Sequence, residues 1–483
     1  MDMERKPRVL LINSPTTNQM KVYANIIPVE FVKKHHPIGL LYVGTYVKNM
    51  AEVKVMDFEA DVSEKKYIYM VKEVLRDFRP DIVGINAFSL TLYDAYEVAK
   101  IVKGENTNVS VVFGGIHTSY YPYEMINQEF IDFIVQGEGE ETFADFISKF
   151  GTDEMYYIPG MISKKKNGKY PDIITNPKRK EIENLDSIPF PDRQLLIDRS
   201  IYRNLLIPKA KETIMISSRG CPYSCAYCQV SGKRYRFRSP ENVVDEMEFL
   251  VEQGYNYVDF FDDTMNIRKD RVKNICREVI KRGLHKKMNW KFRGVANLID
   301  EEMVGLMKES GCDMVYIGIE SGSDRVLKSV NRVVTTENCL NAVRLLKKYG
   351  IKIMGYFIIG LPGETEQEIF QTVNFALNLP LDYIQVNVLV PVPGSSIYLS
   401  AINDPNFGGD YFRDYTVKPE KNFRQRFFET SVSEKRVKEL QKYFYKKFYL
   451  RPSFIVKNTM RQNFHSLPYA FKVFTRFLIK LFI

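Results

Sequence analysis

A chain of 483 residues is long enough for two or three domains of about 150 residues, each with a core of its own. With 45% hydrophobic and 27% charged residues, 27 glycines and 22 prolines, the composition excludes collagen-like and disordered proteins. The net charge of +10 is mostly C-terminal: residues 440–483 hold nine basic and no acidic residues, which leaves +1 for residues 1–439 and argues against a body that coats nucleic acid.

Two further features predict a cytosolic protein with a metal site. No apolar run reaches the ~18 to 20 residues that span a bilayer, and the first residues lack the apolar segment of a signal peptide. Three of the six cysteines are clustered, and the other three are solitary. In a cytosolic setting a cluster indicates a metal site rather than a disulfide framework, while lone cysteines mostly act as small core residues.

The first ~150 residues alternate apolar β-type runs with helical patterns such as 38–50 and 92–103. Strands are expected at 8–13, 52–57, 81–86, 109–114 and 132–136. Continuous apolar strands indicate a sheet covered on both faces, so residues 1–150 are predicted to form a doubly wound, flavodoxin-like parallel α/β domain. Ligands of such sheets bind at the carboxyl ends of the strands.

Residues 151–205 are expected to form a hairpin around Asn167-Gly168 and a proline-rich linker. Six more strands are expected near 213–218, 257–261, 290–295, 314–319, 351–359 and 383–390. Six βα repeats predict an open or partial parallel barrel over 206–400, because an eight-unit barrel typically takes ~250 residues. A helical, basic and aromatic extension is expected over 401–483.

The strongest motif is Cys221-Pro-Tyr-Ser-Cys225-Ala-Tyr-Cys228, just after the first barrel strand. Gaps of three and two residues let one loop wrap a compact iron–sulfur cluster, ligate three irons and leave the fourth open for a substrate. A structural zinc site is the alternative. It needs a fourth protein ligand, and none of the five histidines lies nearby in the sequence.

This spacing, with the aromatic Tyr227 before the last cysteine, resembles the signature of the radical S-adenosylmethionine (SAM) superfamily. The resemblance implies a partial (β/α)6 barrel and a [4Fe–4S] cluster whose open iron binds the amino and carboxylate groups of SAM. Reduction of the cluster would cleave SAM into methionine and a 5′-deoxyadenosyl radical, which abstracts hydrogen from an unactivated carbon.

Two later strand ends offer candidates for binding SAM. Asp262 or Asp263 lies where the family accepts hydrogen bonds from the SAM amino group, and a helix N-cap is the alternative for one of the two. Arg293 would meet the SAM carboxylate, with a structural salt bridge as its alternative role.

The next two strands end in loops that resemble further parts of the SAM site. The segment Glu320-Ser321 resembles the stretch that contacts the SAM ribose, and a Glu after an apolar strand needs a polar partner. The loop at Gly360 would let the backbone approach the adenosyl group closely. Glu364 in that loop has helix capping as its alternative role.

The N-terminal domain resembles the cobalamin-binding module of one branch of this superfamily. Its candidate residues lie in successive strand-end loops: Asn86, Ser89, Gly114, Gly115, His117 and Gly137. The glycines would admit the nucleotide tail of cobalamin, and residues 86–89 would line the corrin. The first loop lacks the histidine that ligates cobalt in the classical module, as is usual in this branch. His117 is interpreted as a loop-structuring residue, and another ligand, or none, is the alternative for the domain.

The C-terminal residues 440–483 interleave twelve aromatic residues with the nine basic ones. Lys472, Arg476 and Lys480 fall on one stripe of an expected amphipathic helix. This pattern is typical of helices that lie on a membrane surface. A helix docked on the enzyme's own barrel, and binding of RNA, are the alternatives.

Together the motifs predict a cobalamin-dependent radical SAM enzyme, sensitive to oxygen, that methylates an unactivated carbon of a lipid or other hydrophobic substrate and takes electrons from a flavodoxin or ferredoxin. Resemblance to anaerobic porphyrin ring cyclases and lipid-modifying enzymes leaves cyclisation or rearrangement as the alternative. An RNA methylthiotransferase would need a second cysteine cluster, and residues 1–212 contain no cysteine. A non-enzymatic cofactor carrier would not need Asp262, Glu320 and the Gly360 loop together.

Overall fold

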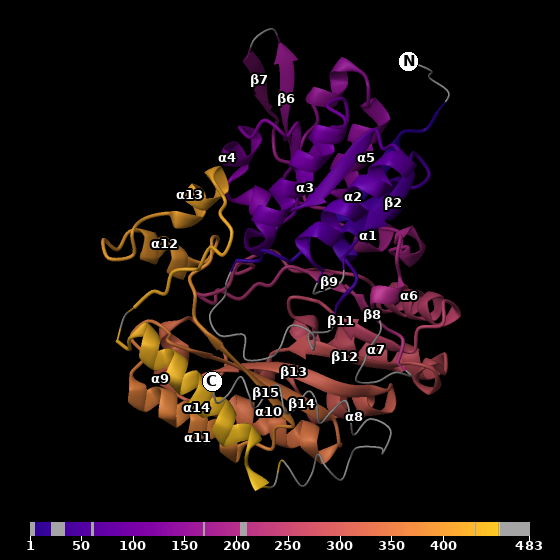
Figure 1. Cartoon of the computed structure of the whole chain (residues 1–483). Coiled ribbons are helices and arrows are strands. Elements are labelled where there is room, and N and C mark those ends of the chain that lie inside the picture. The colour runs from indigo at the N-terminus through magenta and orange to yellow at the C-terminus, as the bar shows by residue number, and fades with distance from the viewer. Residues whose placement is uncertain are drawn as a thin grey trace. The chain divides into compact units, whose positions relative to one another are not determined.

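The computed structural model describes residues 5–20, 34–58, 62–167, 170–202, 210–429, 431–452 and 454, and it divides into two compact units (Figure 1). The first unit contains the described residues up to Tyr202 together with Gly408–Gln425. The second contains those of Arg203–Phe407 and Arg426–Ile483. The expected boundaries at 150 and 400 differ from this division, because the hairpin region and a C-terminal segment both belong to the first unit.

A seven-stranded sheet of order β2-β1-β3-β4-β5-β6-β7 forms the centre of the first unit. Neighbours among β1 to β5 run parallel, and β6 and β7 add an antiparallel hairpin. The strands are β1 (Arg8–Asn13), β2 (Glu52–Met56), β3 (Ile82–Asn86), β4 (Ser110–Gly114), β5 (Phe133–Val135), β6 (Met161–Asn167) and β7 (Tyr170–Thr175). The helices are α1 (Ile38–Val47), α2 (Glu64–Phe78), α3 (Leu92–Glu105), α4 (Pro122–Ile126), α5 (Glu140–Lys149) and, from the C-terminal segment, α13 (Tyr411–Val417).

Burial of this sheet on both faces follows from its sequence. The four middle residues of β1 are all buried, as a continuous apolar run predicts. The register sets Asn13 opposite Asn86 and Asn86 opposite Gly114, so the carboxyl ends of β1, β3 and β4 meet at one edge. This edge carries most of the residues that were predicted to bind cobalamin.

The second unit is built on six parallel strands in the order β15-β14-β13-β12-β11-β8. Its edge strands β8 and β15 are not paired with each other, so the barrel is open, as six repeats predict. The strands are β8 (Glu212–Met215), β11 (Tyr257–Phe260), β12 (Asn289–Gly294), β13 (Cys312–Glu320), β14 (Lys352–Ile359) and β15 (Tyr383–Val388), with a small hairpin of β9 (Ser218–Arg219) and β10 (Arg236–Phe237). The helices are α6 (Pro240–Glu252), α7 (Lys269–Lys281), α8 (Glu301–Glu309), α9 (Asp324–Ser329), α10 (Thr336–Lys348), α11 (Glu366–Asn378), α12 (Ser396–Ile402) and α14 (Glu434–Tyr449).

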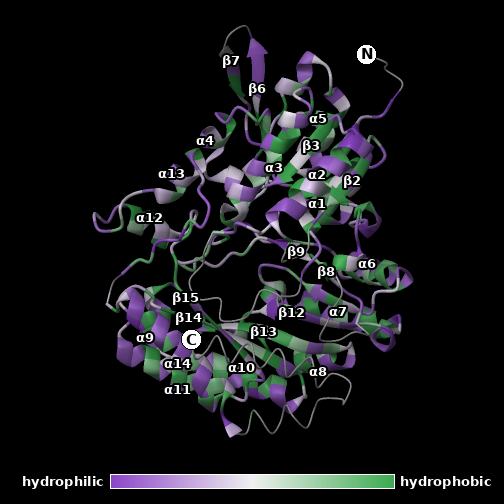
Figure 2. Cartoon of the chain, in the orientation of Figure 1, coloured by the Kyte–Doolittle hydropathy of each residue, from purple (hydrophilic) through white to green (hydrophobic). Residues whose placement is uncertain are grey.

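The two faces of the six-stranded sheet differ in burial. Along β14, Ile353, Phe357 and Ile359 are buried in the hydrophobic core, whereas Met354 and Tyr356 are only half-buried. Successive side chains of a strand point to opposite faces, so one face is covered by helices and the other is partly open. Figure 2 shows the hydrophobic residues concentrated on the strands and on one side of the helices.

Helix α14 packs on the barrel and changes the interpretation of the C-terminal extension. Leu440, Phe444 and Phe448 are at most 1% exposed, and the backbone N–H of Val386 on β15 donates to the hydroxyl of Tyr445 over 2.9 Å. These aromatic residues therefore belong to the core, which is the docked-helix alternative. The predicted stripe of Lys472, Arg476 and Lys480 lies outside the described residues.

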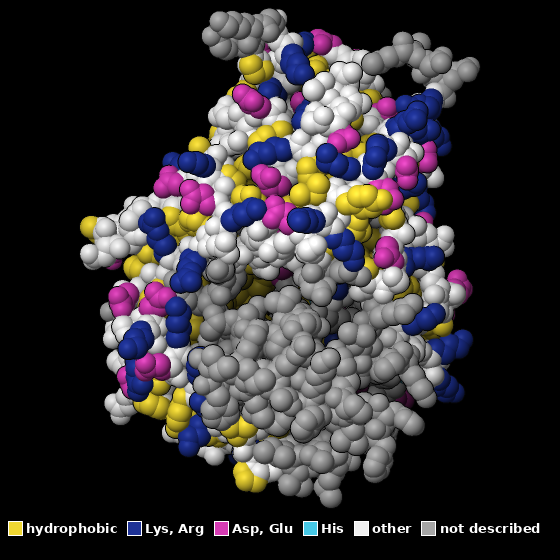
Figure 3. Space-filling model, in the orientation of Figure 1, with side chains coloured by type: hydrophobic (Ala, Val, Ile, Leu, Met, Phe, Trp, Pro, Cys, Tyr) yellow, Lys and Arg dark blue, Asp and Glu magenta, His cyan; other side chains and the backbone are white. Residues whose placement is uncertain are grey.

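The described surface carries mixed charge. In the face drawn in Figure 3, Lys and Arg side chains are interspersed with Asp and Glu, which agrees with the near-neutral balance of residues 1–439. Among the described helices, none is both long and apolar enough to cross a bilayer.

Candidate functional site

The three clustered cysteines lie on the loop between β9 and β10, beyond the carboxyl end of β8. All three are free thiols. The N–H of Cys228 donates to the carbonyl of Cys225 over 3.1 Å, which keeps the loop tight. Burial raises the pKa of Cys228, and the nearby Cys225 and Cys221 raise it further because adjacent thiolates repel one another. Cysteine binds metals as the thiolate, so a metal centre held by this loop would displace the thiol protons.

This donor set suits a cluster better than a single ion. Within the described ranges, no three or more His, Cys, Asp or Glu side chains are gathered into a site for one metal ion. An iron–sulfur cluster takes its thiolates at different irons, so its ligands need not converge on one point. The other three cysteines are buried in the hydrophobic core of the barrel, as predicted: Cys276, Cys312 and Cys339.

Arg332, which follows α9, reaches the cysteine loop from the neighbouring strand ends. Its Nη1 lies 3.6 Å from Sγ of Cys225, and its Nη2 donates to the carbonyl of Gly318 over 2.7 Å. Oε1 of Glu320 lies 3.8 Å from the same Nη2. The remaining donor, Nε, is buried and has no hydrogen-bond partner among the described residues. The structure thus leaves an unused donor beside Cys225, where a bound carboxylate would satisfy it.

Glu320 and Tyr227 complete this group around Cys225. Glu320 ends β13 in the left-handed region, with φ +66°, and is buried beside Arg332. Burial raises the pKa of Glu320, whereas the positive charge of Arg332 and a hydrogen bond from Tyr227 lower it. Tyr227 itself packs against a small apolar cluster that includes Val330. The predicted residues Tyr227 and Glu320 are therefore brought together with the cysteine loop.

Asp262 and Asp263, at the end of β11, bind the backbone of the segment that leads to the cysteines. Asp262 is 1% exposed and accepts from the N–H of Ser217 at 2.7 Å and from the hydroxyls of Ser217 and Ser218 at 2.5 Å each. Asp263 accepts from the N–H of Gly220 over 3.0 Å. These hydrogen bonds fix the start of the loop relative to β11.

Arg293 on β12 lies in a different environment. Its Nη1 donates to Oδ1 of Asp259 over 2.7 Å, and its guanidinium lies 3.9 Å from the ring centroid of Phe261. Arg293 is also not one of the groups that shift the pKa of Arg332, which are Tyr227, Glu320 and Cys225. Arg293 therefore does not belong to the group around Cys225. The geometry thus includes the salt bridge that was the alternative role for this residue.

The glycine loop after β14 is shaped by Glu364. Gly360 has φ +78°, a conformation that favours glycine, and its N–H donates to Oε2 of Glu364 over 2.7 Å. Burial raises the pKa of Glu364 to about 7. Ser321 is buried, with its hydroxyl 3.1 Å from that of Thr372, so it fixes the loop after β13 to α11.

In the first unit, the predicted cobalamin residues line the carboxyl edge of the sheet. Gly115 has φ +102°, and a Cβ there would lie 2.4 Å from Oδ1 of Asn86, so only glycine fits. A Cβ on Gly114 or on Gly137 would meet open space. Asn86 also donates to Oδ1 of Asn13 over 3.3 Å. The turn after β4 therefore packs tightly against β3 and leaves room beside Gly114 for a ligand.

His117 is fully buried between this edge and the C-terminal segment of the same unit. Its Nδ1 lies 2.8 Å from Oγ of Ser89, and its Nε2 lies 2.8 Å from Oγ1 of Thr416. Burial lowers the pKa of His117 to about 3, so the ring is neutral. Both nitrogens are engaged, which supports the prediction that His117 structures the loop.

Two family models match the two units. Residues 215–376 match the Radical SAM superfamily, and residues 24–147 match the B12 binding domain. An uncharacterized methyltransferase of Pyrococcus horikoshii is 34% identical over 466 residues, which cover 94% of this chain and 95% of the relative. The chain belongs to the cobalamin-binding radical SAM enzymes. This family assignment implies a [4Fe–4S] cluster, SAM and cobalamin as cofactors, as predicted.

Other members of the family and two solved structures agree. The anaerobic magnesium-protoporphyrin IX monomethyl ester cyclase of Rubrivivax gelatinosus is 31% identical over 378 residues, which cover 75% of this chain and 65% of the relative. The radical SAM methyltransferase TsrM of Kitasatospora setae has a TM-score of 0.65 at 20% identity, with 82% and 78% of the two chains covered. The cobalamin-dependent SAM radical enzyme OxsB has a TM-score of 0.69 at 17% identity, with 99% and 72% covered. These likenesses confirm the predicted fold.

Sequence reasoning missed Arg332 in this radical SAM enzyme. It lies twelve residues after Glu320, beyond Asn331, whose φ of +56° turns the chain back toward the cysteine loop. Nothing in one sequence distinguishes this arginine from the nearby Lys328, which is exposed. The missing signal is the turn, because only the folded loop brings Arg332 to Cys225.

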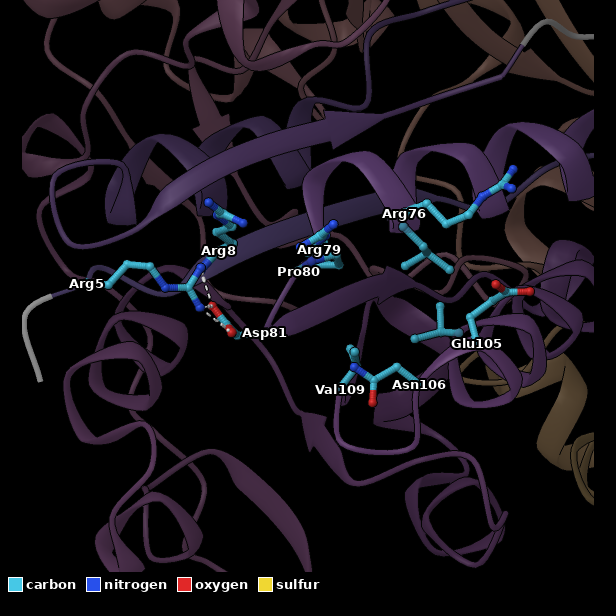
Figure 4. Close-up of a pocket in the computed structure, with 11 residues that line it drawn as sticks. Arg5, Arg8, Arg76, Arg79, Pro80, Asp81, Glu105, Asn106 and Val109 are labelled. Carbon is cyan, nitrogen blue, oxygen red and sulfur yellow. Dashed lines mark hydrogen bonds and ion pairs between the residues drawn. The ribbon is translucent and has the colours of Figure 1, made fainter. Parts of the chain in front are cut away.

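A cavity of about 740 Å³ lies at the opposite, amino ends of the first unit's strands (Figure 4). Its lining includes Arg5, Arg8, Arg76 and Arg79. Helices α2 and α3 both end there, and the partial negative charge of their last carbonyls attracts cations. Accordingly, Nη1 of Arg8 donates to the carbonyl of Phe78 over 3.3 Å, and Arg5 pairs with Asp81 at 2.9 Å. These contacts give the arginines a structural role at the helix ends.

Proposed function

We propose that this enzyme methylates a carbon atom of an organic substrate, with SAM bound beside the cysteine loop of the second unit and cobalamin at the carboxyl edge of the first. The observation that carries the proposal is the group of Arg332, Glu320 and Tyr227 around Cys225, in which Glu320 is buried. When bound, the cluster and SAM supply a 5′-deoxyadenosyl radical, and cobalamin supplies a methyl group.

In this proposal each residue around Cys225 has a distinct task. Cys221, Cys225 and Cys228 hold the cluster. Arg332 binds the SAM carboxylate, because its buried Nε lacks a partner among the described residues and a guanidinium matches a carboxylate in shape and charge. Glu320 accepts from the SAM molecule at the end of β13.

Asp262 and Asp263 both hold the start of the cysteine loop. Asp262 accepts through both of its oxygens, from Ser217 and Ser218, whereas Asp263 accepts through Oδ2 from Gly220 and keeps Oδ1 without a partner among the described residues. The Gly360 loop, shaped by Glu364, and Ser321 support the adenosine part of SAM. Our expectation that one of the two aspartates receives the SAM amino group therefore points to Asp263.

In the first unit, Asn86, Gly114, Gly115 and Gly137 form the cobalamin edge. Ser89 and His117 act through structure, because their polar atoms are bonded to each other and to the C-terminal segment. We also propose a flavodoxin or ferredoxin as electron donor, as the family resemblance implies, a cytoplasmic location, and contact of the part of the extension that follows α14 with a membrane surface, supported by its basic and aromatic sequence.

Ring formation is the second candidate function, because a cyclase is among the relatives above 30% identity. The two functions differ in the products of SAM. Methyl transfer yields one 5′-deoxyadenosine and one S-adenosylhomocysteine for each turnover, whereas cyclisation yields deoxyadenosine without homocysteine.

The experiment is an anaerobic incubation of reconstituted enzyme with cobalamin, methyl-labelled SAM, reductant and cell extract, with both SAM products counted by mass spectrometry. Matched products, with label in an extract compound, are expected. Deoxyadenosine alone would favour cyclisation. A Cys225→Ala variant that still formed deoxyadenosine would contradict the proposed cluster site.

A further inference from the structure

The partly open face of the six-stranded sheet carries two donors that the protein does not use. Arg293 on β12 has Nε and Nη2 without hydrogen-bond partners among the described residues, and its side chain is 25% exposed. Tyr356 on β14 is half-buried, and its hydroxyl likewise has no partner in the described part of the chain. Both point to the same face: the register sets Arg293 opposite Tyr316 and Tyr316 opposite Met354, and Tyr356 follows Met354 by two residues on β14.

Arg293 is held rigidly. Its Nη1 donates to Asp259 at 2.7 Å and to the carbonyl of Phe260 at 3.1 Å. Its guanidinium also lies over two rings, 3.9 Å from the centroid of Phe261 and 4.8 Å from that of Tyr316. Nη1 is thus held by hydrogen bonds, and the plane of the guanidinium is held by the two rings. The edge formed by Nε and Nη2 stays free and has a fixed orientation.

Tyr356 is connected to this arginine through the ring of Tyr316. Its ring stacks on that of Tyr316 with centroids 5.7 Å apart and planes 3° from parallel. Burial raises the pKa of Tyr356 to about 12, and the charge of Arg293 opposes this rise, which agrees with the two side chains sharing one face of the sheet. Tyr316 forms the aromatic floor between them.

On this face the basic side chains are more exposed to solvent than the acidic side chains that they pair with. The carboxylates of Asp259 and Glu212 have side chains 1% and 3% exposed, and both are paired with Lys291. The side chains of Lys291 and Arg293 are 13% and 25% exposed. An entering molecule therefore meets N–H and O–H donors before it meets any acceptor of this network.

Arg293 is separate from the proposed SAM site, whereas Tyr356 lies opposite Gly318, between Arg293 and that site. Tyr316, the register partner of Arg293, lies four residues before Glu320 on β13, about 13 Å at the rise of a strand. The SAM carboxylate would lie near the cysteine loop, because the cluster held there would bind SAM. Arg332 already provides a donor there.

We propose that Arg293 and Tyr356 bind an acidic group of the substrate, a carboxylate or a phosphate, on the inner face of the barrel. The substrate is then an organic acid whose apolar part rests on Tyr316 and Tyr356. This inference rests on the proposed function, because it takes the inner face of the radical SAM barrel as the place of the substrate.

The test uses three fluorinated probes that share one ring: 4-fluorobenzoate, 4-fluorophenyl phosphate and the neutral 4-fluorobenzamide. Their binding to the anaerobic, cofactor-loaded enzyme is measured by ligand-observed ¹⁹F NMR. The better acid is expected to bind at least about tenfold more tightly than the amide, as loss of a charge-assisted hydrogen bond implies. The stronger of the two acids identifies the group, and equal binding assigns both.

Variants locate the effect. Arg293→Met should remove the preference for acids, and Arg293→Lys should keep part of it. Tyr356→Phe, which breaks no hydrogen bond among the described residues and so preserves the fold, should weaken acid binding about threefold or more. The matched control is Arg277→Met, which removes an exposed arginine of α7 that pairs with Glu302.

Three results would overturn the inference: no binding by any probe, equal binding of acid and amide, or a preference for acids that survives Arg293→Met. Titration with SAM supplies a further check, because loss of SAM affinity in Arg293→Met would show that Arg293 binds SAM instead. Failure of the proposed methyl transfer would appear separately, as the absence of S-adenosylhomocysteine in the turnover experiment.

Discussion

The ring of His117 joins the carboxyl edge of the first unit's sheet to a residue 299 positions away, because its Nε2 lies 2.8 Å from Oγ1 of Thr416. Thr416 donates its single hydroxyl proton to the carbonyl of Phe412 at 2.6 Å, so it must accept from Nε2–H. Ser89 then donates to Nδ1. The contacts fix the neutral tautomer of His117 and fasten Gly408–Gln425 to the unit.

Replacing Thr416 with Val should loosen this attachment. The variant leaves Nε2–H of a fully buried histidine without an acceptor, at a cost of about 1–3 kcal/mol. We expect cobalamin to be released at lower urea concentration, measured by its absorbance. Thr107→Val, at an exposed position of the same unit, is the control. Equal release midpoints for the two variants would show that the contact is not needed to hold this edge.

His117 also predicts how the first unit responds to acid. Its folded-state pKa of about 3 lies below the ordinary value of 6.5, so the unfolded chain binds the extra proton between these values. Stability is therefore complete above about pH 6.5 and falls as the pH decreases toward 3, by up to about 1.4 kcal/mol per pH unit. Cobalamin release in urea, repeated from pH 7 to 5, should show a slope that His117→Gln reduces. Parallel profiles for the two proteins would contradict this account.

How far the sequence predicted this molecule depended on how local each feature is. Two features were predictable because each depends only on a short stretch of sequence: the buried strand Arg8–Asn13 and the loop that holds Cys221, Cys225 and Cys228. The contact of Thr416 with His117 and that of Arg332 with Cys225 were not, because each joins segments whose approach depends on the completed fold.

Asp262 shows a third case, in which the position was predicted and the partner was not. A carboxylate at the end of a barrel strand was expected at the site, and it is there. Its three hydrogen bonds go to Ser217 and Ser218, because the cysteine loop folds back over β11. Single-sequence reasoning gives the strand end but not the conformation of the loop that meets it.

The second unit should respond to pH in the opposite direction because of Glu364. Burial raises its pKa from 4.5 to about 7, so the folded state holds a proton that the unfolded state loses. This contribution is complete below about pH 4.5 and is lost as the pH rises through 7, on the order of 3 kcal/mol in total. Trp290, the single tryptophan of the chain, lies on β12 and reports unfolding of this unit by fluorescence.

Between pH 5 and 8, Glu364→Gln should flatten this loss, because the amide carbonyl can still accept from Gly360 and Leu361 without carrying charge. Glu337→Gln, at an exposed position in the first turn of α10, serves as the control. If the Glu364→Gln variant followed the wild-type profile, Glu364 would have to be ionised in the folded protein throughout this range.

Arg332 gives the sharpest test of the SAM site. Arg332→Met removes the buried donor Nε and leaves Glu320 without its ion pair, so SAM should bind at least about tenfold more weakly. Arg332→Lys keeps the charge but lacks the paired N–H donors of a guanidinium, so its affinity for SAM should lie between those of the wild type and the Met variant. The affinity is measured by anaerobic titration of the cluster-loaded protein with SAM. Arg344→Met, at an exposed position of α10, is the control.

Because Cys225 lies 3.6 Å from Arg332, the absorbance of the cluster is recorded for each variant. An intact cluster with wild-type SAM affinity in Arg332→Met would show that the carboxylate is bound elsewhere, whereas weakened binding with an intact cluster would place it at the buried edge of Arg332.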